Sequence, residues 1–287
     1  MQLSAMRELL EAEGIRLTRS LGQNFLHDAN QLRRIVAAAE LAPGARVLEI
    51  GPGLGPLTEL LLAAGAQVLA VEADQRMVQL LQRRLGRPAG LEVIHADALE
   101  WLKKHPRDWS GWRVVSNLPY SVGSPIVVEL ARAPVPPDRL VVTLQREVVD
   151  RLRAETGDDH YGLLTLLVRV VYARGSWFKI PAACFFPEPE VESACLTLHR
   201  RTPPLVSREE LAKFDHLVKL GFSQRRKMLG PLLRKSWHEA DVAAACKYAG
   251  IAPTVRAEAV PLESMLWLLR TLPPPAPAAK RKAAPRP

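Results

Sequence analysis

A glycine-rich loop stands directly after a short apolar segment near residue 50. Arg46–Ile50 (RVLEI) has the pattern of a strand, and Gly51–Gly55 (GPGLG) follows it before a helical stretch. Glycines at the carboxyl end of a first strand let the backbone approach a bound nucleotide closely. The GxGxG spacing differs from the GxGxxG spacing typical of dinucleotide-binding proteins. The loop therefore indicates a nucleotide-like ligand other than a dinucleotide.

Two carboxylates follow the next two expected strands. Glu72 ends the segment Gln67–Glu72, and Asp97 follows the segment Leu91–Ala96. An acidic side chain at the end of the second strand accepts hydrogen bonds from ribose hydroxyls, and one after the third could accept from an adenine amine. Either acid alone could simply cap a helix. Together, after a glycine loop, they favour a cofactor that contains adenosine.

The surroundings of the loop favour S-adenosylmethionine over a nicotinamide dinucleotide. A pyrophosphate prefers a glycine loop that opens onto an unobstructed helix N-terminus, whereas Pro52 and Pro56 stiffen this loop and Glu49 precedes it. A carboxylate beside the loop suits a sulfonium cation better than a pyrophosphate. A nicotinamide oxidoreductase is disfavoured further because the sequence shows no hydride-transfer site.

The segment from Asn117 to Tyr120 (NLPY) ends the fourth expected strand and has the residue types that methyl transfer to an amine requires. Adenine N6 is a poor nucleophile because its lone pair is delocalised into the ring, so acceptors on its N–H groups must orient it. The Asn117 side-chain oxygen and the Leu118 carbonyl are such acceptors, while Pro119 restricts Leu118 to an extended conformation. Tyr120 offers a face for stacking. Catalysis would rest mainly on positioning; an ordinary strand-ending turn is the alternative.

Strand and helix patterns alternate along the first 200 residues, which is typical of a mostly parallel sheet covered by helices on both faces. Two later segments lack a helix-length connection and suggest an antiparallel hairpin at one edge. The sequence therefore predicts an α/β, Rossmann-like fold with a seven-stranded sheet. The expected strands are Arg46–Ile50, Gln67–Glu72, Leu91–Ala96, Arg113–Asn117, Arg139–Gln145, and the hairpin segments Leu166–Phe178 and Ser193–His199; helices are expected over Leu57–Ala64 and Arg76–Leu85.

The character of the chain changes after Arg201. A Pro-containing linker (Thr202–Pro204) precedes Ser207 and Glu210, which have the spacing of a helix-capping box. We expect a catalytic domain over residues 1–201, a small helical domain over 202–272, and a disordered basic tail over 273–287. The helices expected in the second domain span Glu209–Phe222, Arg225–Lys235, Glu239–Tyr248 and Leu262–Leu269.

The formal net charge of +9 favours a polyanionic partner. Basic residues of the second domain gather on or beside one expected helix, whose face could bridge phosphates; a solvated charged face is the alternative. The basic tail either adds an electrostatic arm or only solubilises the protein. Because N6 is out of reach inside a duplex, a looped-out adenine is the expected target. The basic residues of the helix are Arg225, Arg226, Lys227, Arg234 and Lys235.

Several classes of protein are disfavoured by composition. No apolar run approaches the ~20 residues of a membrane span, and the N-terminus lacks the pattern of a signal peptide. The three cysteines, Cys184, Cys195 and Cys246, are widely spaced and form no CxxC or Cys/His cluster. We therefore expect buried thiols and neither a zinc site nor a disulfide framework. The sequence predicts a cytoplasmic protein with no metal site and no membrane association.

Six ordered motifs resemble those of the ribosomal RNA adenine dimethylases, over about residues 18–270. The resemblance implies a class I S-adenosylmethionine-dependent methyltransferase with a small C-terminal helical domain and an RNA substrate. The motifs are Leu21–Leu26 (LGQNFL), Val47–Gly55, Asn117–Tyr120, Gln145–Val148 with Arg151–Leu152 and Tyr161–Gly162, Phe185–Ser193 (FFPEPEVES) and Gly221–Lys227 (GFSQRRK).

The resemblance also implies roles for individual residues. Phe185 would stack on the target adenine opposite Tyr120, beside Asn117, Leu118 and Pro119. Arg225, Arg226 and Lys227 would bind RNA. The residues expected to line the cofactor pocket are Asn24, Leu26, Gly51, Gly53, Glu72, Asp97 and Asn117.

This chain departs from the family's pattern at two places. Glu190 stands where the family usually has a basic residue, which could weaken a local phosphate contact. Ser121–Ser124 (SVGS) replaces a more polar sequence after the Asn117–Tyr120 tetrad. The Glu190 departure leaves the expected stacking residues unchanged.

Within the family, the Leu-Pro-Tyr form of the tetrad and the Gly221–Lys227 block favour the housekeeping enzyme. That enzyme dimethylates two adjacent adenines in a hairpin loop near the 3′ end of small-subunit rRNA during ribosome assembly. The alternatives are the resistance-type enzyme, which dimethylates one adenine of large-subunit rRNA, and a ribosome-assembly factor with weak activity. The expected partner is small-subunit rRNA or a pre-30S particle, and the expected state is a monomer.

Overall fold

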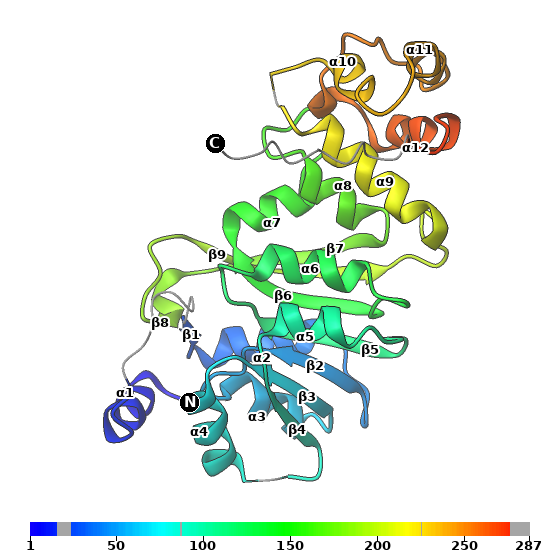
Figure 1. Ribbon diagram of the computed structural model, residues 1–287. Coiled ribbons are helices and arrows are strands. Elements are labelled where there is room, and N and C mark those ends of the chain that lie inside the picture. Colours follow the sequence, from blue (N-terminus) through cyan, green and yellow to red (C-terminus); the bar gives the residue numbers. More distant parts are fainter. Residues whose placement is uncertain (16–23, 87, 225, 276–287) are drawn as a thin grey trace, which may run out of the picture. The chain divides into compact units, whose positions relative to one another are not determined.

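The computed structural model describes residues 1–15, 24–86, 88–224 and 226–275. They fall into two compact units (Figure 1). The first unit contains Met1–Arg153 and Val168–Leu205, and the second contains Ala154–Leu167 and the chain from Val206 onward. We expected a domain boundary after residue 201, and the chain passes from the first unit to the second for the last time between Leu205 and Val206. The excursion of Ala154–Leu167 into the helical unit was not predicted.

A seven-stranded sheet with the order β4-β3-β2-β5-β6-β9-β7 forms the centre of the first unit. The neighbours from β4 to β6 pair in parallel, whereas β9 is antiparallel to both β6 and β7. The predicted mostly parallel sheet with an antiparallel edge is thus confirmed. The strands are β2 (Arg46–Ile50), β3 (Gln67–Glu72), β4 (Leu91–His95), β5 (Trp112–Asn117), β6 (Arg139–Gln145), β7 (Tyr172–Ile180) and β9 (Ser193–Arg200).

The five parallel strands begin and end within one residue of their predicted bounds, because strands covered on both faces are short apolar runs between turn residues. The strand expected over Leu166–Phe178 is wrong in its first part. Leu163–Arg169 forms helix α8, and β7 begins only at Tyr172. A short continuous apolar run such as LLTLLVRVV fits a buried helix as well as a buried strand, so periodicity could not separate the two.

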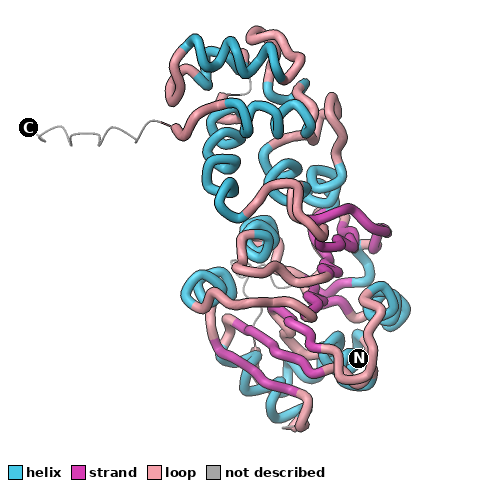
Figure 2. The backbone as a smooth tube through the Cα atoms, turned by 90° about the vertical axis from the view of Figure 1, so that its right-hand side faces the viewer, coloured by secondary structure: helices cyan, strands magenta, loops and turns pink. Residues whose placement is uncertain are grey.

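Helices cover both faces of this sheet, with α5 and α6 in front of it and α2 and α3 behind it in Figure 1. In Figure 2 the magenta strands of the first unit lie between cyan helices. Leu32 and Ile35 of α2 and Leu57 and Leu61 of α3 share one buried cluster with strand residues such as Val115. The helices are α2 (Ala29–Ala38), α3 (Pro56–Ala63), α4 (Gln75–Leu85), α5 (Ala98–Lys104), α6 (Gly123–Ala131) and α7 (Arg146–Arg153).

The N-terminal region adds two elements that were not predicted. Helix α1 (Leu3–Ala12) buries Met6 and Leu10, which are four residues apart and so share one helix face. These side chains cluster with Phe25, Leu54 of the glycine loop and residues of α4. Strand β1 (Phe25–Leu26) pairs antiparallel with β8 (Phe185–Phe186), which follows a short 3-10 helix, η2 (Ala182–Cys184). Sequence-distant segments are therefore joined beside the glycine loop.

The second unit is formed by helices and loops. Ser207 and Glu210 make the predicted capping box at the start of α9 (Arg208–Gly221). The helix expected over Arg225–Lys235 is wrong, because α10 spans only Leu229–Leu233 and Gly230 packs against the backbone of Pro253. Arg225 and residues 276–287 of the basic tail lie outside the described residues. The other elements are α11 (Glu239–Tyr248), η3 (Ala257–Ala259) and α12 (Leu262–Thr271).

The sequence disfavours membrane spans and metal sites, and two findings on the described part of the chain bear on them. None of its helices is both long and apolar enough to cross a membrane. Its His, Cys, Asp and Glu side chains form no group of three or more that could hold a metal ion. All three cysteines are free; Cys195 and Cys246 are buried and Cys184 is half-buried.

Candidate active site

A cavity of about 220 Å³ opens at the carboxyl ends of the parallel strands. The ends of β2, β3 and β5 and the residues that follow β4 contribute to its lining, since the ends of parallel strands meet at one edge of a sheet. Nine predicted site residues line it: Asn24, Gly51, Gly53, Glu72, Asp97, Asn117, Leu118, Pro119 and Tyr120.

The glycine loop is shaped by left-handed backbone conformations and by a close neighbour. Gly51, Gly53 and Gly55 have φ angles of +67°, +54° and +80°. A Cβ atom on Gly53 would lie 2.4 Å from the ring of Phe25, whereas one on Gly51 would have only ordinary contacts with Pro119. Gly53 is therefore required for two reasons, its backbone conformation and the approach of the Phe25 ring.

Glu72 connects the end of β3 to the glycine loop. Its Oε2 accepts a hydrogen bond from Gly53 N at 3.0 Å, and its Oε1 accepts one from Asp74 N at 3.0 Å. Burial raises the pKa of Glu72, and these backbone donors oppose that shift. Each carboxylate oxygen has a further lone pair, so the side chain can still accept hydrogen bonds from two ribose hydroxyls.

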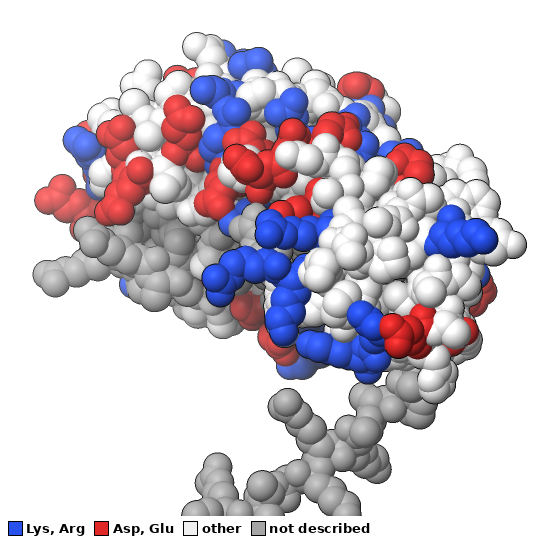
Figure 3. All heavy atoms as spheres, turned by 90° about the horizontal axis from the view of Figure 1, so that it is seen from above, with Lys and Arg blue, Asp and Glu red and all other residues white. Residues whose placement is uncertain are grey.

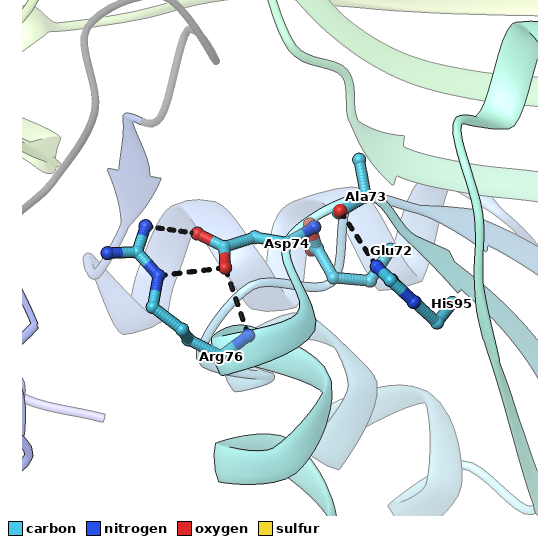
Figure 4. A network of polar contacts seen from close by, with 5 residues as sticks. All are labelled: Glu72, Ala73, Asp74, Arg76 and His95. Atoms are coloured by element: carbon cyan, nitrogen blue, oxygen red, sulfur yellow. Dashed lines mark hydrogen bonds and ion pairs between the residues drawn. The ribbon is translucent and has the colours of Figure 1, made fainter.

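The neighbours of Glu72 are held by their own polar contacts, drawn in Figure 4. Asp74 caps α4 by accepting from Arg76 N and forms an ion pair with the Arg76 guanidinium at 2.6 Å. His95 Nε2 lies 3.1 Å from the carbonyl oxygen of Ala73. The turn that follows Glu72 is therefore fixed on both sides.

Glu49 is a second buried acid, and it lies behind the glycine loop. Its Oε2 accepts a hydrogen bond from Thr58 Oγ1 at 2.8 Å. Burial raises the pKa of Glu49 to about 8, and the nearby carboxylate of Glu72 contributes in the same direction. It lines a small cavity of about 20 Å³, together with Leu26 and Asn117. Glu49 is therefore mostly protonated at neutral pH, so its expected attraction for a sulfonium cation is weak in the unliganded protein.

The Asn117 amide is oriented by the chain segment that precedes β1. Its Nδ2 donates to the carbonyl oxygen of Asn24 at 2.9 Å. Its Oδ1 is buried and has no hydrogen-bond partner among the described residues. A buried acceptor without a donor costs about 1–3 kcal/mol, a cost that a ligand N–H group would remove.

The rest of the tetrad turns away from the sheet at the same edge. Leu118 N donates to Thr143 O at 3.1 Å, which continues the pairing of β5 with β6 for one more residue. Val122 N donates to Pro119 O at 3.1 Å and closes a turn around Tyr120. The Tyr120 hydroxyl shares a hydrogen bond with Ser193 Oγ. Burial raises the pKa of Tyr120, so the phenol is neutral at physiological pH.

Asp97 has both roles that the sequence left open. Its Oδ1 accepts a hydrogen bond from Glu100 N at 2.8 Å and so caps α5. The residue is exposed and also lines the cavity. Helix capping by one oxygen leaves the other for a ligand amine.

Leu26 and Phe185 lie apart from the main cavity. They pair with each other between β1 and β8 and belong to the apolar core, where Phe185 is 3% exposed. The stacking role expected for Phe185 stays a prediction, because its ring is enclosed in this conformation. Neighbouring strand residues point to opposite sides, and the next residue, Phe186, instead lies beneath the guanidinium of Arg7 at 5.0 Å.

Sequence reasoning missed several lining residues. Phe25, Ala73 and Leu99 line the cavity beside predicted residues. Their positions in the sequence could have indicated them. Phe25 is adjacent to Asn24, and Ala73 and Leu99 follow expected strands by one and three residues. Apolar side chains there give the cavity walls for a flat ring.

A sequence model described as "Ribosomal RNA adenine dimethylase" matches residues 14–272. The chain belongs to this family. It is 36% identical over 275 residues to the ribosomal RNA small subunit methyltransferase A of Staphylococcus aureus, covering 92% of this chain and 93% of that protein. It is 37% identical over 273 residues to the protein of the same name from Phenylobacterium zucineum, covering 93% and 94%.

Solved structures agree with the fold. The 23S rRNA methyltransferase ErmE superposes with a TM-score of 0.65 at 29% identity, covering 86% of this chain and 99% of that chain. A dimethyladenosine transferase from Plasmodium falciparum has a TM-score of 0.66 at 24% identity, covering 85% and 95%. The fold is thus that of a class I methyltransferase, and the cofactor is S-adenosylmethionine.

The residues of the cavity fit this cofactor. The buried Glu72 carboxylate has unused lone pairs for ribose hydroxyls, and exposed Asp97 can accept from an adenine amine. The glycines of the loop have no Cβ atoms, and Cβ atoms on Gly51 and Gly53 would approach Pro119 and Phe25.

We predict that Gly53→Ala abolishes cofactor binding, because a Cβ atom would collide with Phe25 at 2.4 Å and strain a backbone with φ of +54°. Calorimetric titration with S-adenosylmethionine measures this. Gly44→Ala is the matched control, since Gly44 also has a positive φ, of +77°, but has open space around its Cβ position. Equal affinities of the Gly53→Ala variant and the wild type would contradict the steric argument.

We also predict a pH dependence of stability that Glu49→Gln removes. The folded-state pKa of about 8 lies above the unfolded value of 4.5. Its stabilising contribution is therefore fully present below about pH 4.5 and is lost as pH rises towards 8. The slope relative to Glu49→Gln should approach 1.4 kcal/mol per pH unit at most, an order-of-magnitude value. Urea unfolding of both proteins without cofactor, between pH 5 and 8, tests this; parallel curves would refute it.

Proposed function

We propose that this protein transfers methyl groups to N6 of two adjacent adenosines in a 3′-terminal hairpin loop of small-subunit rRNA. The observation that carries the proposal is the Oδ1 atom of Asn117, a residue that lines the cavity. This buried acceptor has no donor among the described residues. Its family and the names of relatives at 36% and 37% identity support the choice of RNA.

Asn117 and Leu118 would orient the target amine. The bond from Asn117 Nδ2 to Asn24 O turns Oδ1 towards a donor, so the amide can accept from one N6–H group. The Leu118 carbonyl would accept from the other, since Pro119 restricts its residue to an extended backbone. Two acceptors draw the N6 lone pair out of conjugation with the ring and direct it at the methyl donor.

S-adenosylmethionine supplies, when bound, a methyl group activated by a sulfonium sulfur. The protein needs no strong base, because the amine becomes acidic as the new N–C bond forms and can lose its proton to water. Tyr120, neutral and half-buried, would provide the stacking surface for the adenine. The contribution of the protein is then positioning, which can lower a barrier by up to about 7–11 kcal/mol.

A second methylation uses the same site. After the first transfer N6 keeps one N–H group, which one of the two acceptors can still hold. The remaining lone pair again requires orientation rather than a base. The two acceptors therefore support dimethylation with the same residues.

Basic side chains of the second unit would bind the phosphates of the RNA. Arg226 and Lys227 are exposed in the turn before α10, and Arg234 and Lys235 are exposed after it. Figure 3 shows blue Lys and Arg side chains gathered over part of one face. The four named basic residues therefore flank α10, two before its start and two after its end.

We propose further that the protein acts in the cytoplasm, as a monomer, on rRNA or on an assembling pre-30S particle. One other substrate is supported by a specific observation. The likeness to ErmE, at 29% identity, favours an adenine of large-subunit rRNA. The higher identity to the small-subunit enzymes makes it the second candidate.

We predict that Asn117→Ala lowers methyl transfer by roughly 100-fold or more, because misplacing the amine by about 1 Å has an effect of this size. Methyl incorporation into purified small-subunit and large-subunit rRNA, with mass spectrometry of the nucleosides, measures both rate and substrate. Asn30→Ala, on the exposed surface of α2, is the control. Near-normal turnover by Asn117→Ala would exclude the mechanism, and dimethyladenosine only in large-subunit rRNA would select the second candidate.

Charge reversal at Arg225 and Arg226 should weaken RNA binding and flatten its salt dependence. Each lost phosphate contact lowers the slope of log K against log salt by about 0.7–0.9. Fluorescence anisotropy with a labelled rRNA hairpin at several salt concentrations measures the slope. Reversal at Arg33 and Arg34, two exposed residues of α2, changes the net charge by the same amount and is the control. An unchanged slope would remove this turn from the RNA interface.

A further inference from the structure

Ser193 is a buried hydroxyl residue at the carboxyl edge of the parallel strands. It is the first residue of β9, and it pairs with Gln145, the last residue of β6, and with Ile180, the last residue of β7. Because β9 runs antiparallel to β6, its beginning lies where the parallel strands end. The topology therefore brings a residue from far along the chain to the edge that carries the tetrad.

The Ser193 side chain has one identified partner, the phenol of Tyr120. Ser193 is 0% exposed, and its Oγ shares a hydrogen bond with the Tyr120 hydroxyl. This contact gives each of the two oxygen atoms one hydrogen-bond partner. A buried hydroxyl without a partner is costly, so the pair favours one orientation of the Tyr120 ring.

Tyr120 needs such a restraint because no strand holds it. It lies in the turn closed by Val122 N and Pro119 O, beyond the last residue of β5. Without a bond at its far end, the ring could rotate about its side-chain torsions. The hydrogen bond fixes the ring at its hydroxyl while the backbone turn fixes it at Cα.

This arrangement also separates two possible roles of the phenol. The hydroxyl is engaged with Ser193 at the start of β9, and Tyr120 also lines the cavity. The ring face is then the part of Tyr120 offered to a ligand. The hydroxyl serves as the anchor.

We propose that Ser193 is a positioning residue, which holds the Tyr120 ring in the orientation that stacks on the target adenine. The inference rests on the proposed function, since stacking presumes an adenine substrate. Ser193 is the last residue of the Phe185–Ser193 segment, and in this role it acts through Tyr120 and does not touch the substrate.

The test compares Ser193→Ala, Tyr120→Phe and the double variant in methyl transfer to small-subunit rRNA. Each single change removes the same hydrogen bond, so each should lower kcat by about fivefold to tenfold, as expected for one hydrogen bond. The double variant should show the same loss, not the product of the two. The affinity for S-adenosylmethionine should be unchanged. Thr197→Val removes another buried β9 hydroxyl, which lies near Ser176, and should leave kcat unchanged.

Multiplying losses in the double variant, or a wild-type kcat for Ser193→Ala, would overturn the proposal. A loss equalled by Thr197→Val would assign Ser193 a merely structural role and overturn it as well. A second measurement needs no activity. The chain has four tyrosines, so ring-labelled tyrosine gives few NMR signals, and Ser193→Ala should broaden that of Tyr120 alone.

The two measurements separate this proposal from the proposed function. A wild-type protein that methylates no small-subunit rRNA defeats the proposed function, and the Tyr120 signal then still reports whether Ser193 holds the ring. An unchanged Tyr120 signal in Ser193→Ala defeats the positioning role, whatever RNA is methylated.

Discussion

The hydrogen bond from Gly53 N to the buried carboxylate of Glu72 is the contact on which the cofactor site depends. It joins the glycine loop after β2 to the end of β3, across 19 residues of sequence. Parallel pairing of these strands makes the contact possible, because both end at the same edge. The same side chain also accepts from Asp74 N and so shapes the turn into α4. One carboxylate thus joins the loop to the turn, and it is the acceptor that we propose for the ribose hydroxyls.

Burial at this edge leaves polar atoms poised for a ligand. Glu72 and Glu49 are both enclosed, and burial raises the pKa of each. Asn117 Oδ1 lacks a donor in the described structure. Such groups reduce the stability of the unliganded protein, since each has lost water without full replacement. A ligand that donates hydrogen bonds to the unused acceptors would restore those interactions, as the proposed function requires.

Segments far apart in sequence orient the reactive groups. Asn24 O and Asn117 Nδ2 are separated by 93 residues, and their bond leaves Oδ1 as the amide atom without a partner among the described residues. Tyr120 and Ser193 are separated by 73 residues. The pairing of β1 with β8 encloses Phe185 beside the same region. Positioning in this enzyme is therefore a property of long-range contacts around a locally encoded tetrad.

The parallel strands, the glycine loop, and the acids and tetrad at the strand ends could be predicted from the sequence. Each of them is a local pattern of apolar runs and turn residues. The sequence also identified the family through six motifs. It did not reveal α1, the excursion of Ala154–Leu167, the short α10, or the helical start of the Leu166–Phe178 segment. Three features depend on tertiary contacts: the enclosure of Phe185, the hydrogen bond from Asn117 to Asn24, and the hydrogen bond between Tyr120 and Ser193. Those outcomes depend on which distant segments pack together, and local sequence patterns do not encode that choice.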